Sequence, residues 1–305
     1  MSLVVDVLSG AVRGGTSVMY AALGETVSEK AGVVNLGTEG CMLLGALTGF
    51  ATAAVSGNPW LGVLVAVFGG GGLAAIHAVL VITRGANQFA SGLTLLFLAL
   101  GLTSLYGADY VGREIPALNP IAVPLLSDIP LLGPILFNQD GLTYLSYLAA
   151  PALWYLMAKT RPGLLLRTAG ERVEVLTVHG YRIATTRYAA VIAGGALAGI
   201  GGAHLSIAYA QSWFENMIVG RGFIAVALVI FASWQPLRVL AGAYLFGAAL
   251  ALSPALQARG VGINQFALDV LPFVVTLLVL AFLGRRTLLR APDELRRVFD
   301  NTASN

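Results

Sequence analysis

The chain has 305 residues, of which 57% are hydrophobic and only 11% are charged, and its mean hydropathy is +0.81. A soluble domain carries about 25% charged residues, so this composition excludes a soluble protein and indicates a bundle of helices in a membrane. The formal net charge of +3 comes from basic residues between apolar stretches and near the carboxyl end, which indicates membrane topology and no nucleic-acid partner.

The apolar stretches predict an all-α polytopic membrane protein with about nine transmembrane helices. Most stretches approach the length that crosses a hydrocarbon core at 1.5 Å per residue, and the shortest need help from neighbouring helices. Glycines at 69–72 and 194–202 fit close packing of membrane helices better than a nucleotide-binding loop. The approximate spans are 12–27, 41–56, 60–82, 89–108, 142–158, 188–210, 223–233, 239–256 and 266–283.

The distribution of Arg and Lys predicts which loops lie in the cytoplasm. Residues 159–187 and the tail from Arg285 are rich in basic residues, so both are expected on the cytoplasmic side. The acidic, proline-containing segment 109–140 is expected outside. Residues 1–290 then form one transmembrane domain, and residues 291–305 form a cytoplasmic tail.

Two segments break the apolar pattern. The first, 24–40, places charged and amide side chains between two apolar runs, and its glycines favour a helix that breaks inside the bundle. An ordinary cytoplasmic turn, with Glu29 and Lys30 paired in water, is the alternative. The second, 211–223, precedes an apolar run of only 11 residues, and Arg221 within it either lines a solute route or extends to a membrane interface.

A third segment, 164–178, mixes charges with Val and Leu at roughly helical spacing. The pattern predicts a short surface helix, which either lies on the membrane or docks into a soluble partner.

Several kinds of chemistry have no sequence support. The chain contains no phosphate-binding loop, zinc motif or nucleophile elbow, so we expect no ATPase, catalytic or metal site and no cofactor. Cys41 is the single cysteine, and His77 and His204 are expected to be hydrogen-bonded packing residues. Asp269 and Glu39 are the carboxylates that an ion-coupled carrier would need.

The broken and charged segments also carry a family resemblance. Residues 23–45, LGETVSEKAGVVNLGTEGCMLLG, resemble the amino-terminal signature of ABC importer permeases in the branched-chain amino acid and ribose permease superfamily, in its simple-sugar and nucleoside branch. Residues 166–187 are similar to the coupling segment of that family, and residues 219–231 with Trp234 and Pro236 are similar to its second-half motif. Thr38, Cys41 and the pair 232–233 depart mildly from the pattern.

This resemblance implies a permease that carries a nucleoside or related sugar-like solute across the plasma membrane of a prokaryote. It implies four partners: a cytoplasmic ABC ATPase, a second homologous permease in a heterodimer, an extracytoplasmic substrate-binding lipoprotein, and the lipid bilayer. Carried onto this sequence, it assigns the translocation path to Asn35, Gly37, Glu39, Gly220, Arg221 and Phe223. It assigns ATPase coupling to Arg167, Gly170, Glu171, Arg172, Glu174 and His179.

Three alternatives remain open at the level of sequence. The solute is a simple sugar, a riboflavin-like compound or a branched-chain amino acid, or the chain is an ion-coupled secondary transporter, or it is a membrane scaffold without transport. A scaffold has no need for two polar helix breaks, and an ion-coupled carrier has no need for a docking loop.

Overall fold

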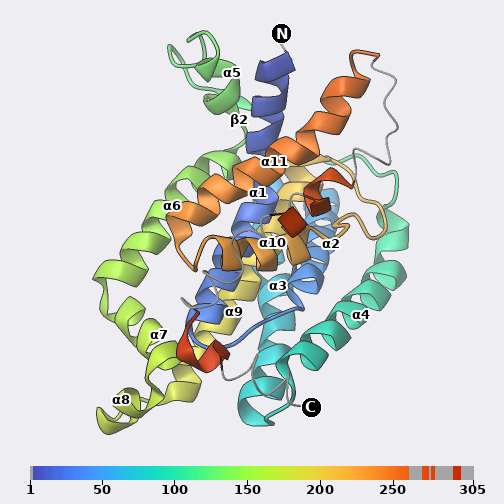
Figure 1. Ribbon diagram of the computed structural model, residues 1–305. Helices are drawn as coiled ribbons and strands as arrows, with labels where there is room; N and C mark the ends of the chain where they lie inside the picture. The colour runs from blue at the N-terminus through green and yellow to red at the C-terminus, as the bar shows by residue number, and fades with distance from the viewer. Residues whose placement is uncertain (1–2, 261–269, 275, 279–290, 297–305) are drawn as a thin grey trace.

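The computed structural model describes residues 3–260, 270–274, 276–278 and 291–296, and helices dominate them (Figure 1). Strands β1 (Ile121–Ala122) and β2 (Asn138–Gln139) form a two-residue antiparallel ladder, with Ile121 opposite Gln139. The α-helices are α1 (Leu3–Lys30), α2 (Thr38–Ser56), α3 (Pro59–Ala78), α4 (Gln88–Gly107), α5 (Leu132–Leu136), α6 (Gly141–Lys159), α7 (Arg161–Glu171), α8 (Val173–Val178), α9 (Ile183–Ala203), α10 (Arg221–Phe231) and α11 (Pro236–Gln257). Three short helices extend this set: η1 (Val79–Thr83), η2 (Ala108–Tyr110) and η3 (His204–Tyr209).

The described part of the chain contains five helices long and apolar enough to cross a membrane: Thr38–Ser56, Pro59–Thr83, Gln88–Tyr110, Ile183–Tyr209 and Pro236–Gln257. This confirms a polytopic helical membrane protein. The expected spans at 12–27, 142–158 and 223–233 are parts of α1, α6 and α10, and the one at 266–283 lies largely outside the described residues. The total of nine stays a prediction.

Helix α1 runs through the middle of the bundle, packed along α9, α11 and α10, while α2 packs against α3, α9 and α4 (Figure 1). Met19 and Leu23 of α1 are fully buried. Because other helices cover it, α1 can carry Glu25 and Glu29 without exposing them to lipid. In contrast, α4 exposes apolar side chains such as Phe97 on its outer face.

Glycines set the closest helix contacts. A β-carbon at Gly45 would lie 2.5 Å from the Cα of Gly199, and one at Gly24 would collide with the backbone of Gly194. Gly70 meets Gly195 and Gly199 in the same way. The glycine runs therefore let α1, α2 and α3 approach α9, which confirms the predicted packing role.

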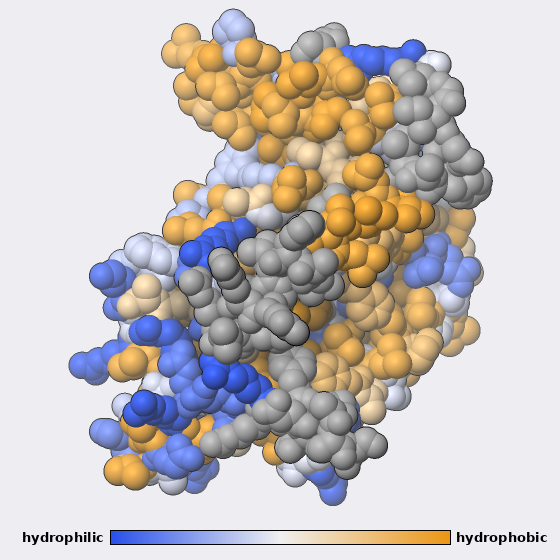
Figure 2. All heavy atoms as spheres, viewed as in Figure 1, coloured by the Kyte–Doolittle hydropathy of each residue, from blue (hydrophilic) through white to orange (hydrophobic). Residues whose placement is uncertain are grey.

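The two ends of the bundle differ in composition. The amino terminus, α5 and the β1–β2 ladder lie together at one end, and α7 and α8 lie at the other (Figure 1). Hydrophilic residues gather on the surface around α7 and α8, whereas apolar side chains cover much of the remaining face (Figure 2). Near the α7 end, residues 291–296 pack against the bundle, with Ala291 and Leu295 buried.

The glycine contacts predict an effect on stability. Replacing Gly199→Ala would press a methyl group into the carbonyl of Ala66, and we expect it to lower the free energy of unfolding by about 1–3 kcal/mol. Gly72→Ala is the matched control, because nothing lies within 4 Å of a β-carbon there. Reversible unfolding in mixed micelles, followed by tryptophan fluorescence, measures both. Equal stability of the two variants would show that the predicted contact is not tight.

Candidate functional site

The first helix break is an ordered, buried segment. Residues 31–37 join α1 to α2, and Gly32 takes a positive φ of 85° at the turn. Glu25 holds the segment from within α1: its Oε1 accepts from the Asn35 backbone N–H at 2.7 Å and its Oε2 accepts from the Thr38 hydroxyl at 2.8 Å. The Asn35 side chain in turn accepts from Gly37 N–H at 2.9 Å. The segment is therefore braced by the bundle itself.

The alternative of a solvated turn at this position is wrong. Glu29 is 1% exposed and its carboxylate accepts a hydrogen bond from the indole N–H of Trp234, while Lys30 lies 3.9 Å from Glu171. The two residues expected to pair in water thus have separate partners. Glu29 fixes the carboxyl-terminal end of α1 to the turn that follows α10.

The second break lies between η3 and α10. Residues 210–220 leave the helical path, and Val219 and Gly220 adopt positive φ values of 48° and 80° immediately before α10 begins at Arg221. Only glycine takes this conformation without strain, so Gly220 suits the turn better than Val219 does. The sharp reversal brings the amino-terminal end of α10 into the bundle.

Glu39 joins the two breaks. Its Oε1 accepts from Gly220 N–H and its Oε2 from Gly222 N–H, both at 2.6 Å, although the residues are more than 180 positions apart. Glu39 also lies in the first turn of α2, so its negative charge is close to the amino-terminal end of that helix, while its hydrogen bonds go to α10. Such ends carry unpaired N–H groups and attract negative charge. A β-carbon at Gly222 would lie 2.5 Å from Glu39 Cα, so only glycine permits this approach.

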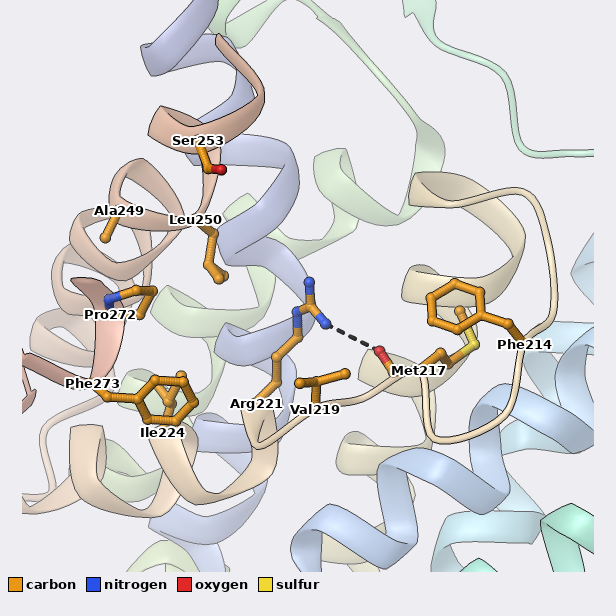
Figure 3. A pocket seen from close by; sticks show the side chains of 10 residues that line it. All are labelled: Phe214, Met217, Val219, Arg221, Ile224, Ala249, Leu250, Ser253, Pro272 and Phe273. Carbon is orange, nitrogen blue, oxygen red and sulfur yellow. Dashed lines mark hydrogen bonds between the residues drawn. The ribbon is translucent and has the colours of Figure 1, made fainter. Parts of the chain in front are cut away.

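A cavity of about 520 Å³ opens beside the second break (Figure 3). The guanidinium of Arg221 projects into it, and Phe214 and Phe273 lie on opposite sides of Arg221 (Figure 3). Arg221 Nη1 donates to the carbonyls of Met217 and Ile218, each at 3.1 Å, whereas its buried Nε has no hydrogen-bond partner. The other lining residues are Met217, Val219, Ile224, Ala249, Leu250, Ser253 and Pro272. Arg221 thus lines a cavity inside the bundle, and its part in a solute route stays a prediction.

The other predicted path residues lie elsewhere. Asn35, Gly37 and Glu39 are buried behind the cavity and do not line it, and their contacts are with the protein itself. Phe223, 39% exposed, is also outside the lining. The structure brings Glu39, Gly220 and Arg221 together, and the backbone of Phe223 also hydrogen-bonds Glu39. The role of these residues in a path stays a prediction.

The predicted coupling segment consists of two helices, α7 and α8, which meet at Arg172. Glu171, Arg172, Glu174 and His179 are exposed, whereas Gly170 is buried against the backbone of Lys30. Arg167 is partly buried. A groove of about 320 Å³ between the two helices is lined by Arg161, Leu164, Leu165, Thr168, Val175, Leu176, His179 and Tyr181. The chain bends at Arg172, so α7 and α8 enclose a mainly apolar groove with exposed charged side chains around its edge.

Both apolar-run histidines are packing residues, as predicted. His77 lies within hydrogen-bond distance of the Ser91 hydroxyl at 3.1 Å and of the Val34 carbonyl at 3.0 Å. His204 Nε2 lies 3.4 Å from an Asp140 carboxylate oxygen. Burial alone would raise the pKa of Asp140, but its hydrogen bonds with His204 and Thr143 outweigh burial and hold the pKa below its ordinary value. No group of three or more metal-ligating side chains occurs among the residues described.

Sequence reasoning did not identify three residues that hold the site together: Glu25, Glu29 and Trp234. The spacing of Glu25 and Glu29, four residues apart on an otherwise apolar helix, was the available signal, because both then share one helix face. Nothing in the sequence indicated that Trp234, 205 residues away, would be a partner.

Comparison with known proteins gives a consistent result. Residues 7–282 match the family described as branched-chain amino acid transport system / permease component. The chain is 40% identical to the putative glucose ABC transporter permease protein TsgC13 of Haloferax volcanii, over 94% of each chain. It is 34% identical to the nucleoside ABC transporter permease protein NupC of Lactococcus lactis, over 88% of this chain and 90% of that one. It is also 30% identical to the glucose ABC transporter permease protein TsgB13 of Haloferax volcanii, over 74% and 64%. No solved structure matches the chain significantly.

The carboxyl group that joins the breaks predicts a local change on mutation. Glu39→Gln replaces one acceptor oxygen by an NH₂ group that faces a backbone N–H, so one of the two bonds to α10 is lost. We expect amide hydrogen exchange in residues 217–223 to become about tenfold faster. Glu114→Gln, an exposed carboxyl before β1 and outside this connecting segment, should leave that exchange unchanged. Equal exchange in Glu39→Gln and the parent would mean that the cap is not needed.

Proposed function

The chain belongs to the family of branched-chain amino acid transport system permease components, and we propose that it forms the translocation path for a nucleoside or a related sugar-like solute. It is a multi-pass membrane subunit of an ABC importer and not the ATPase. Membership in this family excludes the ion-coupled carrier and the scaffold. The observation that carries the proposal is the cavity with Arg221, formed where two broken helices meet at Glu39.

The chemistry of the cavity supports a nucleoside over a hexose. Arg221 offers only hydrogen-bond donors, and the faces of Phe214 and Phe273 offer stacking surface. A nucleobase presents carbonyl and ring-nitrogen acceptors on a flat aromatic ring, which matches both features. The ribose of a nucleoside carries fewer hydroxyl groups than a hexose and so needs fewer acceptors. Among the described residues of the lining, Ser253 has the one side-chain oxygen that can accept a hydrogen bond, and no carboxylate or side-chain amide is present.

A simple sugar is the second candidate. Its support is the 40% identical relative, whose name describes a putative glucose permease, against 34% for the relative named for nucleosides. Identity at this level does not separate solutes, because a few side chains in the path decide which hydrogen bonds are replaced. Riboflavin-like compounds and branched-chain amino acids are further outcomes of the same transport assay.

We infer that the α7–α8 end faces the cytoplasm and docks an ABC ATPase. The surface there is hydrophilic (Figure 2), and Glu171, Arg172, Glu174 and His179 are exposed on it. Basic residues concentrate in the same region, in keeping with a cytoplasmic position. Gly170 is buried and Arg167 is partly buried on the side of α7 that faces the bundle. These two residues would not contact the ATPase but would pass a movement of α7 to the rest of the bundle. The bent pair of helices around an apolar groove offers a rigid lever for a partner.

The remaining partners follow from the type of transporter. We infer a second, related permease beside this one, a substrate-binding lipoprotein on the opposite side, and the plasma membrane of a prokaryote as the location. Two relatives support the pairing, because TsgC13 and TsgB13 come from one organism and both names describe glucose permeases. Exposed apolar side chains on the outer helices, such as Phe97, suit contact with lipid or with this second subunit.

Arg221 provides the test of the solute. In the importer complex purified through a tag on this chain and reconstituted in liposomes, we expect ATP-dependent uptake of radiolabelled nucleoside that excess glucose does not compete away. Arg221→Met should lower nucleoside uptake by about tenfold or more, since the ligand then loses a hydrogen-bond donor in the cavity. Arg238→Met, an exposed arginine at the start of α11, is the control.

Uptake of glucose with no uptake of nucleoside would contradict the nucleoside assignment and favour the second candidate. Wild-type uptake by Arg221→Met would remove Arg221 from the path, whichever solute is carried.

The coupling surface gives a separate prediction. A chain with both Glu171→Ala and Arg172→Ala should insert normally but hydrolyse ATP without matching uptake, so the number of ATP molecules used per solute rises severalfold. The matched control is Arg113→Ala with Glu114→Ala, an exposed basic–acidic pair before β1. This pair should leave both ATPase co-purification and ATP use per solute unchanged. Unchanged ATP use per solute in the first pair would rule out this surface as the coupling site.

A further inference from the structure

Arg187, in the first turns of α9, contacts three separate parts of the chain. Its Nε donates to the carbonyl of Ala31 at 3.1 Å, and its Nη2 donates to the carbonyl of Ala169 at 3.2 Å. The same Nη2 lies 2.8 Å from Glu294 Oε2, in an ion pair whose side chains are each about one-fifth exposed. One guanidinium thus binds the end of α1, the last turn of α7 and the carboxyl-terminal segment.

Two of the acceptors of Arg187 lie where the coupling helix meets the first helix break. Ala31 is the first residue after α1 and opens the segment 31–37, and Ala169 precedes the buried Gly170 of α7. Both acceptors are backbone carbonyls, so they report where the two chain segments lie and do not depend on rotamers. Arg187 therefore fixes the distance between the coupling helix and the first helix break.

Direct packing reinforces this joint. A β-carbon at Gly170 would collide with the carbonyl of Lys30, so α7 touches the end of α1 without an intervening side chain. Lys30 Nζ lies 3.9 Å from Glu171, on the other side of the same contact. On the opposite face, Gly32 packs against the Glu294 side chain. The start of segment 31–37 is thus enclosed by α7, α9 and residues 291–296.

From this joint, polar contacts continue to the cavity. Glu25 holds Asn35 and Thr38, and Glu39, next to Thr38, holds the amino-terminal end of α10 at Gly220 and Gly222. Arg221 of the cavity lies between those two glycines. A displacement of α7 would reach Arg221 through these contacts, because each link is a short hydrogen bond to buried backbone or to a neighbouring residue.

We propose that Arg187 is a positioning residue that transmits movement of α7 to the segment 31–37, with Glu294 holding its guanidinium in place. The inference rests on the proposed function, since it needs α7 to be moved by a partner. A planar guanidinium reaches several acceptors in fixed directions, whereas a lysine ammonium acts as a single point charge. A basic residue that served membrane topology alone would need no backbone acceptors.

The experiment uses the reconstituted importer complex and two readouts. The first is the number of ATP molecules hydrolysed per solute taken up, and the second is hydrogen exchange in residues 31–39 and in α7, with and without ATP plus vanadate. Arg187→Ala should raise ATP use per solute at least fivefold and abolish the nucleotide-linked change in 31–39, while the change in α7 persists. Arg187→Lys should fall between, and Glu294→Gln should show a smaller effect of the same kind.

Arg84→Ala is the control, because Arg84 is an exposed arginine after η1, and it should leave both readouts at the wild-type level. If Arg187→Ala keeps the nucleotide-linked exchange change in 31–39, the proposal is wrong. If the alanine variant does not assemble, Arg187→Lys and Glu294→Gln decide the matter by the same two readouts. The hydrogen-exchange measurement does not depend on which solute is carried. If the nucleoside assignment is wrong, the exchange result for Arg187 still stands, so the two proposals can fail separately.

Discussion

The carboxyl group of Glu39, placed between the amino-terminal ends of α2 and α10, is the contact on which the rest of the site depends. Helix ends within a membrane bundle have N–H groups that no lipid can satisfy, and a buried carboxylate has lone pairs with the same difficulty. Hydrogen bonds between the carboxylate and the helix-end N–H groups satisfy both. Because the two helices come from opposite halves of the sequence, this pairing also fixes how the halves sit together.

A second set of polar contacts, carried by α1, supports the first. Glu25 orders the segment that leads to Glu39, and Glu29 holds Trp234 at the far end of α10, so α10 is fixed at both ends by carboxylates of other helices. These contacts explain why α1 lies at the centre of the bundle. A membrane helix that carries two carboxyl groups is stable only where other helices surround them. The low hydropathy of α1 therefore does not mean that α1 lies at the surface.

The sequence predicted the helical membrane fold, the two breaks, the packing glycines and the two packing histidines, because each leaves a local signal in composition or spacing. It did not predict the partners of Glu25, Glu29 and Arg187, since these lie 10 to 205 residues away along the chain. Only the three-dimensional path of the helices brings them together. For the same reason Arg187 was interpreted as a topology signal, although its acceptors are backbone carbonyls, and the coupling segment was predicted as one helix although it bends at Arg172.

The shortness of α10 has an electrical consequence. Its 11 residues extend only about 16 Å, roughly half of a hydrocarbon core of about 30 Å, so a helix with one end near a surface has its other end near the middle of the membrane. Arg221 begins α10 and carries its guanidinium into the cavity that we propose as part of the translocation path. In such a path its positive charge would repel sodium ions and protons, whereas neutral solutes would pass without that barrier. The same side chain that offers hydrogen bonds to a solute would therefore keep the importer from dissipating the membrane potential.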